Sequence, residues 1–445
     1  MNQDRSATIT GLGVQCAAGS GLAEFTAALR DGVPGVTFEP PAEGLPPALG
    51  VAALPRHSPR DALDTQLAGI DPQLRDRTRP LMRRATRSKQ YALLAAIEAW
   101  SQAALPAERD TTRTGIVVAG GNQAHELYQD MGRKFRKSPS YVRPSYAVEL
   151  WDTDLLGTAS ELLGCHGEGL STGGASAAGN VGLLTGLRMV RDGYADVCLV
   201  LAPLTELSPV ERMALFNLGA LGAKTRTEPA GERCRPFDAQ HDGFIYGEGA
   251  AALVLESPEH AARRGARPLA TLLGGASALH GSRLTTPSLD GEVRVMRRAL
   301  DDAGRGTDRV DLISAHATST PLGDVTEAEA IREVFGERTG EVWVNATKSL
   351  IGHCLGAAAA IQAVAAVQQL RHGFIHPNAN LKDPVPQAEP LRLAPTTAVD
   401  ARPRLVLSNA FGFGGINTSV LLGEAPELPG EPPESPTAHP SPRVG

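Results

Sequence analysis

Two kinds of hydrophobic pattern alternate along this chain. Short and nearly unbroken apolar runs predict buried strands, whereas apolar residues that recur every third or fourth position predict helices. The apolar runs lie at 7–14, 114–121, 195–202, the end of 233–256, 267–275 and 310–315. The helical patterns lie at 22–29, 90–103, 290–303 and 324–335. This alternation predicts an α/β fold in which helices cover both faces of a sheet.

A further helix is predicted within residues 170–193, which begin with glycine and other small residues. Apolar residues then recur at helical spacing from Leu183 to Val190. Ser176 lies where the loop becomes the helix, so its hydroxyl is expected near unpaired N–H groups and the positive end of the helix dipole. A serine at such a position is commonly an N-cap, and a nucleophile is the alternative interpretation.

Two segments show little periodicity. Residues 30–80 are rich in Pro, Gly and Arg and are predicted to form surface loops. Residues 423–445 are rich in Pro and Glu, and we predict a disordered tail outside the fold.

Composition narrows the class of protein. A chain of 445 residues that is 42% hydrophobic can bury a large core, as two domains or one duplicated fold. A net charge of −6 argues against nucleic acid as a partner. The five cysteines form no CxxC pair, and no histidines cluster at metal-ligand spacing, so we expect reduced thiols and no metal. Without a signal peptide or an apolar run of membrane-spanning length, the chain is expected to be cytoplasmic and away from membranes.

Basic residues gather in two stretches despite the negative net charge. One lies within 75–87 and the other within 133–137. Each is either an ordinary solvated surface or a docking patch for an acidic partner.

Three later segments carry candidate chemistry. His316 follows a predicted strand, and His353 stands between glycine-containing segments at the start of an alanine-rich helix. Residues 409–417 are predicted to form a glycine-rich loop after another strand. Two imidazoles without a third ligand do not make a metal site. Together with a nucleophile at a helix start, they are typical of acyl-transfer sites.

Several motifs carry a family resemblance. The segments AHATSTPLGD, NATKSLIGHCLGAA and NAFGFGGIN, with ITGLGV and RPFDAQHDGFIYGEGA, resemble β-ketoacyl-[acyl-carrier-protein] synthases of the KAS I/II type over residues 7–422. The resemblance implies the thiolase fold, with duplicated αβαβα halves in five layers, here 1–258 and 259–422. It also implies a homodimer, or a heterodimer with a related ketosynthase. Acyl groups would arrive on the phosphopantetheine of an acyl carrier protein, and no other cofactor is expected.

The resemblance assigns roles by position. His316 and His353 correspond to the pair that binds a malonyl thioester carbonyl and promotes loss of CO2. Lys348 and Glu327 correspond to a supporting ion pair. Phe413 corresponds to a gating residue whose N–H completes an oxyanion hole with the N–H of the nucleophile. The expected substrate-binding residues are Thr318 and Thr320 of the pantetheine tunnel, together with Asp324 and Phe411.

The nucleophile departs from the family pattern. Counting back from Asp192 places Ser176 at the position of the family's cysteine. A rival alignment, anchored on Ser171 and Thr172, places Gly174 there but needs a gap at the helix start, and neither alignment gives cysteine. A thiol at a helix N-terminus can ionise near neutral pH, whereas a serine hydroxyl needs a base. Elongation should therefore be impaired, while decarboxylation needs only stabilisation of the enolate by the histidines and the oxyanion donors.

Three functions follow as hypotheses. The first is decarboxylation of a malonyl-type unit on an acyl carrier protein, in polyketide or fatty-acid-type biosynthesis. The second is an acyltransferase in which Ser176 carries an acyl ester to an alcohol or amine. The third is a non-catalytic partner, similar to a chain-length factor, although a purely structural subunit would not need His316, His353, Lys348 and Phe413 together.

Overall fold

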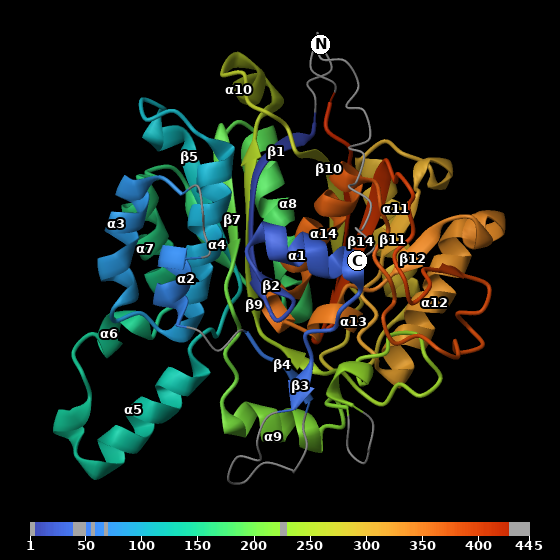
Figure 1. The fold of residues 1–445 in the computed structure, drawn as a ribbon, viewed down its shortest axis with the longest axis horizontal. Coiled ribbons are helices and arrows are strands. Elements are labelled where there is room, and N and C mark those ends of the chain that lie inside the picture. The colour runs from blue at the N-terminus through green and yellow to red at the C-terminus, as the bar shows by residue number, and fades with distance from the viewer. Residues whose placement is uncertain (1–4, 39–49, 55–57, 66–69, 223–228, 427–445) are drawn as a thin grey trace, which may run out of the picture.

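The computed structural model describes residues 5–38, 50–54, 58–65, 70–222 and 229–426. One mixed sheet of twelve strands organises this part of the chain (Figure 1). Its main path has the order β13-β12-β11-β14-β15-β10-β1-β9-β7-β5-β6, and β2 pairs with β1. The strands of this sheet are β1 (Ala7–Cys16), β2 (Gly19–Ser20), β5 (Thr114–Ala119), β6 (Gly169–Thr172), β7 (Val197–Ala202), β9 (Gly249–Glu256), β10 (Ala270–Leu279), β11 (Leu312–Ser314), β12 (Trp343–Asn345), β13 (Arg392–Leu393), β14 (Leu405–Gly412) and β15 (Ile416–Gly423). A small second sheet holds β3 (Thr37–Phe38), β4 (Gly50–Ala52) and β8 (Tyr246–Gly247).

Helices cover the outer faces of the sheet and also lie between its two parts. The described helices are α1 (Leu22–Asp31), α2 (Pro59–Thr65), α3 (Pro72–Met82), α4 (Arg87–Ala103), α5 (His125–Lys137), α6 (Tyr146–Glu149), α7 (Thr153–Leu163), α8 (Ala178–Arg191), α9 (Pro209–Asn217), α10 (Pro258–Arg263), α11 (Leu289–Asp302), α12 (Pro321–Phe335), α13 (Lys348–Ile351) and α14 (Ala358–His372).

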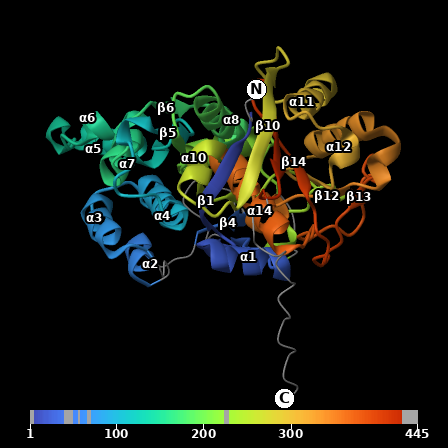
Figure 2. The same cartoon turned by 90° about the horizontal axis from the view of Figure 1, so that it is seen from above.

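The elements form five layers. Helix α4 packs on β1 and β9 from outside, and α11 packs on β10 and β15 from the opposite outer side (Figure 2). Helices α8 and α14 contact each other and lie between the two parts of the sheet. The expected thiolase-type layering is thus confirmed. Strand β1 pairs antiparallel with β10, so strands from before and after residue 258 belong to one sheet.

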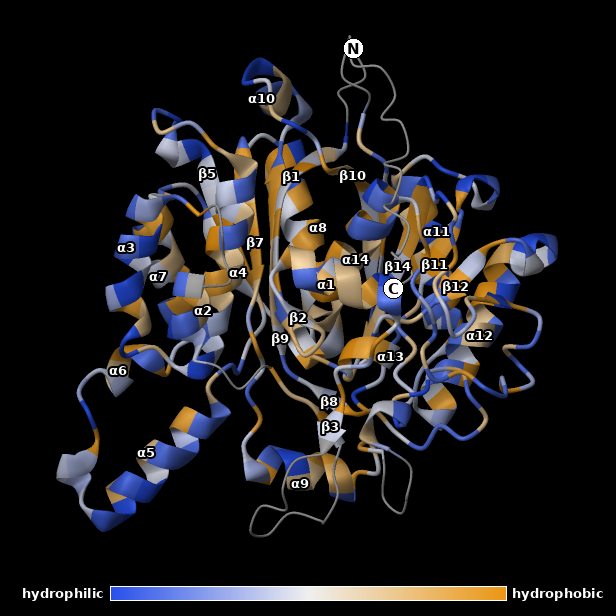
Figure 3. Ribbon diagram, in the orientation of Figure 1, coloured by the Kyte–Doolittle hydropathy of each residue, from blue (hydrophilic) through white to orange (hydrophobic). Residues whose placement is uncertain are grey.

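The central helices are buried because their sequences allow close approach. Helix α14 is alanine-rich and buried along nearly its whole length, as expected for a helix enclosed on all sides. On α8, a Cβ at Gly179 would lie 2.3 Å from the backbone nitrogen of Ala360, so only glycine fits where the helices meet. Figure 3 shows the corresponding hydrophobic colour along the strands and central helices.

Most predicted elements are present, with three corrections. Residues 30–80 do not form loops alone, because α2 and most of α3 lie there. Asp71 caps α3, and the few apolar residues of this helix are too sparse to be conspicuous in the sequence. The glycine-rich segment 409–417 is mainly the hairpin of β14 and β15, and only 413–415 form its loop. Gly423, placed in the tail, is the last residue of β15, while 427–445 lie outside the described residues.

One edge of the molecule carries an arm and an open strand. Helices α5 and α6 project from the side of the main sheet that ends in β6 (Figure 1). Strand β6 pairs only with β5 among the described strands, and its residues are mostly exposed. Apolar side chains are exposed nearby, including Leu170 on β6 and Trp151 beside the arm, at 38% and 62%.

No helix within the described ranges is long and apolar enough to cross a membrane.

Candidate active site

Helix α8 places Ser176 at its N-terminal end. Ser176 lies in the short 3-10 turn Ala175–Ala177 that leads directly into α8, as the sequence predicted. Ala175 has a φ of 46°, a left-handed conformation that is costly for a residue with a Cβ. Such a constrained entry fixes the direction of the half-buried Ser176 side chain.

The Ser176 hydroxyl contacts His353. The distance from Ser176 Oγ to His353 Nε2 is 2.9 Å. On the other side of the ring, the backbone N–H of Leu355 donates to Nδ1 at 3.3 Å. A backbone N–H can only donate, so Nδ1 holds a lone pair and the neutral imidazole carries its hydrogen on Nε2. His353 therefore donates to Ser176 and does not act as its base.

A second imidazole stands next to the first. The rings of His316 and His353 meet edge to face, with centroids 5.8 Å apart. Lys348 Nζ donates to the backbone carbonyl of His316 and lies 3.5 Å from its Nδ1. Since an ammonium has no lone pair, it leaves the imidazole hydrogen of His316 on Nε2 as well. Both histidines therefore present an Nε2–H.

The segment that carries His316 is held by Glu327. One carboxylate oxygen accepts from the backbone N–H of His316 at 2.9 Å, and the other accepts from Ala317 at 2.7 Å. Among the described residues, no direct ion pair joins Glu327 to Lys348. The two groups interact through space, while their hydrogen bonds converge on the same short segment. Lys348 and Glu327 are thus close to each other without a direct ion pair, and both support the backbone of His316.

Burial sets the charge of the site. It lowers the pKa of both His316 and His353 well below the usual range, and the Lys348 charge lowers both further. Burial also lowers the pKa of Lys348 to about 8 and raises that of Glu327. Near pH 7 the site therefore holds two neutral imidazoles beside an ammonium.

The turn after His316 gathers three of the expected substrate-binding residues. The hydroxyls of Thr318 and Thr320 lie 2.8 Å apart. Asp324 accepts from the backbone N–H of Thr318 at 2.9 Å and from that of Thr320 at 3.3 Å. It also accepts from the N–H of Phe237 at 2.8 Å, so this buried carboxylate fixes the turn.

The two phenylalanines of the β14–β15 hairpin are placed differently. Phe411 is buried, and its ring centroid lies 5.4 Å from that of His316. Phe413 is 44% exposed at the tip of the hairpin. The hairpin packs closely on the turn before Ser176, because a Cβ at Gly412 would lie 2.6 Å from the carbonyl oxygen of Gly174. Phe413 is therefore on the segment adjacent to Ser176.

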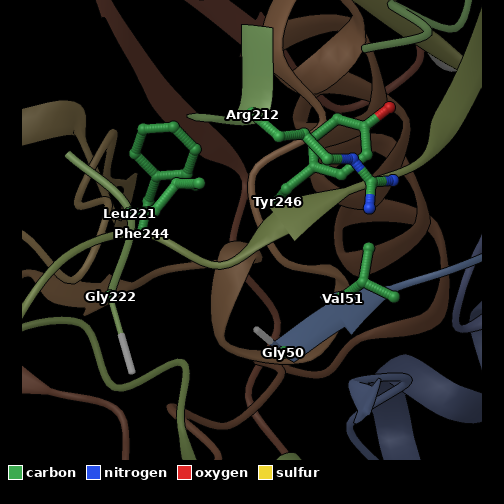
Figure 4. A pocket seen from close by; sticks show the side chains of 7 residues that line it. All are labelled: Gly50, Val51, Arg212, Leu221, Gly222, Phe244 and Tyr246. Atoms are coloured by element: carbon green, nitrogen blue, oxygen red, sulfur yellow. The ribbon is translucent and has the colours of Figure 1, made fainter. Parts of the chain in front are cut away.

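Sequence reasoning missed several residues of the site. Phe244 meets the His353 ring edge to face at 5.1 Å, and it also lines a small hollow (Figure 4). Gln362 accepts from Lys348, and Asn409 donates to Glu327 at 3.1 Å. The Leu355 N–H also sets the His353 tautomer. Phe244 and Asn409 lie within the quoted motifs, but only the folded chain shows what they contact.

The hollow is bordered by apolar side chains and one cation. Its lining residues are Gly50, Val51, Arg212, Leu221, Gly222, Phe244 and Tyr246. Figure 4 shows the Arg212 side chain beside the Tyr246 ring, and the distance from its Cζ to the ring centroid is 5.0 Å.

Besides the two imidazoles, the described ranges contain a thiol next to His353 and side chains of the types that bind metals. Cys354 follows His353, but burial raises its pKa well above the usual value, so the thiolate is strongly disfavoured. Across the described parts of the chain, no three His, Cys, Asp or Glu residues group as metal ligands would. The chemistry that the site can perform is hydrogen-bond donation to an oxygen from two fixed imidazoles.

Comparisons with known proteins agree with this arrangement. Residues 4–261 match the family model described as "Beta-ketoacyl synthase, N-terminal domain", and residues 269–382 match the corresponding C-terminal domain. The chain is 34% identical over 354 residues to "Polyketide biosynthesis malonyl-ACP decarboxylase PksF" of Bacillus subtilis strain 168, covering 80% of this chain and 84% of that protein. It is also 34% identical over 344 residues to "3-oxoacyl-[acyl-carrier-protein] synthase 2" of Staphylococcus aureus, covering 76% and 84%.

Solved structures show the same fold. A type II polyketide ketosynthase, bound to its acyl-carrier protein and a hexaketide, superimposes with a TM-score of 0.84 at 26% identity. The ishigamide ketosynthase/chain length factor gives 0.82 at 31% identity. Each comparison covers 95% of this chain and 100% of the other.

Proposed function

Because this chain belongs to the β-ketoacyl synthase family, we propose that it decarboxylates a malonyl-type thioester carried on the phosphopantetheine of an acyl carrier protein. This is the activity for which its Bacillus subtilis relative is named. The proposal places Ser176 at the position of the family's nucleophilic cysteine. Contact between Ser176 and His353 supports that placement over the alternative at Gly174.

One observation carries the proposal. The Leu355 N–H occupies Nδ1 of His353, so the Nε2–H points out of the ring toward Ser176. That hydrogen, with the equivalent one on His316, is suited to bind the thioester carbonyl oxygen. As the bond to the carboxylate breaks, negative charge grows on this oxygen, and fixed donors in a buried site stabilise it strongly.

The same observation argues against an acyltransferase that uses Ser176. A serine nucleophile needs a base to accept its proton. The His353 nitrogen nearest to Ser176 already carries a hydrogen, and Lys348 is directed at His316 and Gln362. Lys348 and Glu327 both hold the backbone of His316 in place, which argues against the third hypothesis, a non-catalytic subunit. A subunit that only shapes a tunnel does not need imidazole donors held in fixed directions.

The proposed substrate path follows from the remaining residues. We assign Thr318 and Thr320 to the wall that receives the pantetheine arm, with the buried Asp324 holding their turn and Phe411 packed behind His316. Phe413, exposed at the hairpin tip, is assigned as the gate. Its backbone N–H and that of Ser176 are the proposed oxyanion donors.

We also propose that the chain forms a homodimer through the edge of β6. Two copies related by a two-fold axis can pair their β6 strands antiparallel and so remove two open sheet edges. Trp151 lies next to this strand, because the adjacent Asp152 carbonyl accepts from the Ser171 hydroxyl. Pairing of two copies would cover the exposed Leu170 and Trp151 side chains.

The proposed activity is tested by incubating the protein with malonyl-carrier protein and measuring the mass of the intact carrier. We expect acetyl-carrier protein with little condensation product. Replacing His316 or His353 with alanine should lower turnover by ~10²-fold or more, the scale for losing a polarising group. His166→Ala, which changes an exposed histidine on another surface, is the matched control. Unchanged turnover in both site variants would exclude the decarboxylase mechanism.

A further inference from the structure

Decarboxylation leaves an enolate that must gain a proton at carbon. We infer that the Ser176 hydroxyl is the group that delivers this proton, so that Ser176 serves as an acid and not as a nucleophile. The inference rests on the proposed decarboxylation, and it assigns to the serine a chemical role that goes beyond filling the space of a thiol.

The first support is the hydrogen-bond polarity at Ser176. The Oγ accepts from His353 Nε2–H at 2.9 Å, so the Ser176 hydrogen points elsewhere. Within the described part of the chain, that hydrogen has no acceptor. In the free protein the hydroxyl is therefore held by one bond, on a constrained turn, and its own proton is left available for a substrate bound at the imidazoles.

The second support is position. The enolate oxygen is proposed to take the Nε2–H hydrogens of His353 and His316. In the free protein the first of these hydrogens points at Ser176 Oγ, so the bound oxygen lies beside the serine. The α-carbon is only two bonds from that oxygen, which brings it within reach of the same hydroxyl.

The third support is that, among the described residues, the ammonium and the thiol nearest to the imidazoles are directed elsewhere. Lys348 Nζ is turned to the far side of His316, toward its carbonyl and Gln362. The Cys354 thiol is buried against the carbonyl of Ile351. The rings of Phe244 and Phe411 cover the two histidines and limit the access of water on those sides.

The step balances as follows. The bond between the α-carbon and the carboxylate breaks, CO2 leaves, and the electron pair passes into the enolate. That pair then forms a C–H bond with the Ser176 proton, and the O–H pair stays on Oγ as an alkoxide. Once the product carbonyl is neutral, the His353 Nε2–H returns to the alkoxide and stabilises it, together with the N-terminal end of α8, until water reprotonates it. Overall, the malonyl thioester and water give the acetyl thioester, CO2 and hydroxide.

The test is the isotopic content of the product formed in an equal mixture of H2O and D2O. Thiols hold deuterium less favourably than hydroxyls, so the ratio of protium to deuterium in the new C–H bond depends on which group donates the proton. We expect Ser176→Cys to give acetyl-carrier protein with a higher ratio of protium to deuterium than the wild type. Ser176→Ala, with water as donor, should also differ from the wild type. Ser277→Cys, at an exposed serine of β10, is the control and should match the wild type.

The possible outcomes separate the two proposals. Residual malonyl-carrier protein is analysed in each sample, so that exchange of its α-hydrogens is subtracted. An isotope ratio that is the same in wild type, Ser176→Ala and Ser176→Cys would overturn proton delivery by Ser176 while leaving decarboxylation in place. Absence of any acetyl product from the wild type would overturn the proposed function, and this inference with it.

Discussion

At the scale of single residues, the site depends on donors whose direction is fixed by neighbours. The Leu355 N–H and the Lys348 ammonium each occupy an Nδ1 position, which leaves both Nε2–H groups for the proposed contact with a substrate oxygen. Burial lowers the pKa of both imidazoles and keeps them neutral near pH 7, so each ring has one N–H group and its position is set by the contact at Nδ1. In this network the Ser176 hydroxyl oxygen accepts a hydrogen bond from His353.

Lys348 predicts the alkaline side of the pH profile. Its lowered pKa of about 8 means that the ammonium is charged below that pH and is lost above it. Decarboxylation should therefore decline above about pH 8, as His316 loses its charged support. Lys348→Met should lower activity at pH 7 by about tenfold or more, the scale of a hydrogen bond from a charged group, and should abolish this decline.

Turnover from pH 6 to pH 10 checks this prediction. Lys89→Met, which removes a lysine paired with Asp154 elsewhere, should keep the decline. An unchanged alkaline limb in Lys348→Met would assign the decline to another group.

Glu98 predicts a pH dependence of stability. Its carboxylate accepts from the N–H groups of Val14 and Leu22, but burial raises its pKa from 4.5 to about 7. The folded state then binds more protons than the unfolded state between these values. This group therefore makes stability fall as pH rises from about 4.5 to about 7, by on the order of 3 kcal/mol.

Denaturant unfolding at pH 5 and pH 8 measures this effect. The difference in unfolding free energy between the two pH values should be smaller in Glu98→Gln than in the wild type. Glu24→Gln, at an exposed carboxylate of α1, should behave as the wild type. An equal pH dependence in Glu98→Gln would refute a raised pKa at Glu98.

At the scale of elements, folding sorts the two basic stretches into paired and unpaired charges. Arg79 of α3 pairs with Asp64 and Asp76, while Arg133 and Lys134 of α5 pair with acidic side chains of their own helix. Within the described part of the chain, Arg136 and Lys137 have no such partner, and neither do the exposed Arg83 and Arg84 after α3.

These unpaired charges are the proposed docking points for an acidic carrier protein. Arg136→Glu with Lys137→Glu, or Arg83→Glu with Arg84→Glu, should weaken carrier binding, mainly through slower association. Affinity should also fall as salt rises past the concentration at which the Debye length is about 8 Å. Arg297→Glu, on α11 at the opposite side, is the control. If neither double variant binds more weakly and salt has no effect, docking is not electrostatic.

At the scale of the whole molecule, the open edge of β6 predicts the assembly state. Leu170→Asp should place a charge in the proposed seam between two copies and convert a dimer to a monomer. Leu279→Asp, at a leucine 70% exposed on β10, should leave the assembly unchanged. Sedimentation of both variants distinguishes these outcomes, and a wild-type monomer at micromolar concentration would overturn the dimer.

The sequence by itself determined the class of fold and singled out the residues of the candidate site. The alternation of apolar runs and helical patterns predicted the layered α/β architecture, because burial on a sheet or helix face imposes a fixed period. The motifs around His316, His353 and Ser176 identified residues that the fold brings together, although Ser176 and His353 are 177 positions apart. Sequence spacing alone gave no distance between them.

Only the tertiary structure decided how these groups act. The tautomer of His353 depends on a backbone N–H, and every residue except proline has one, so no side-chain pattern marks Leu355. The hydrogen bonds of Lys348 and Glu327 converge on the backbone of His316, so that α12 and α13 meet the segment after β11 in a contact that no local pattern encodes. Helices α2 and α3 were missed because their few apolar positions become meaningful only against α4. Side-chain types are written in the sequence, whereas the direction of each donor is set by long-range packing.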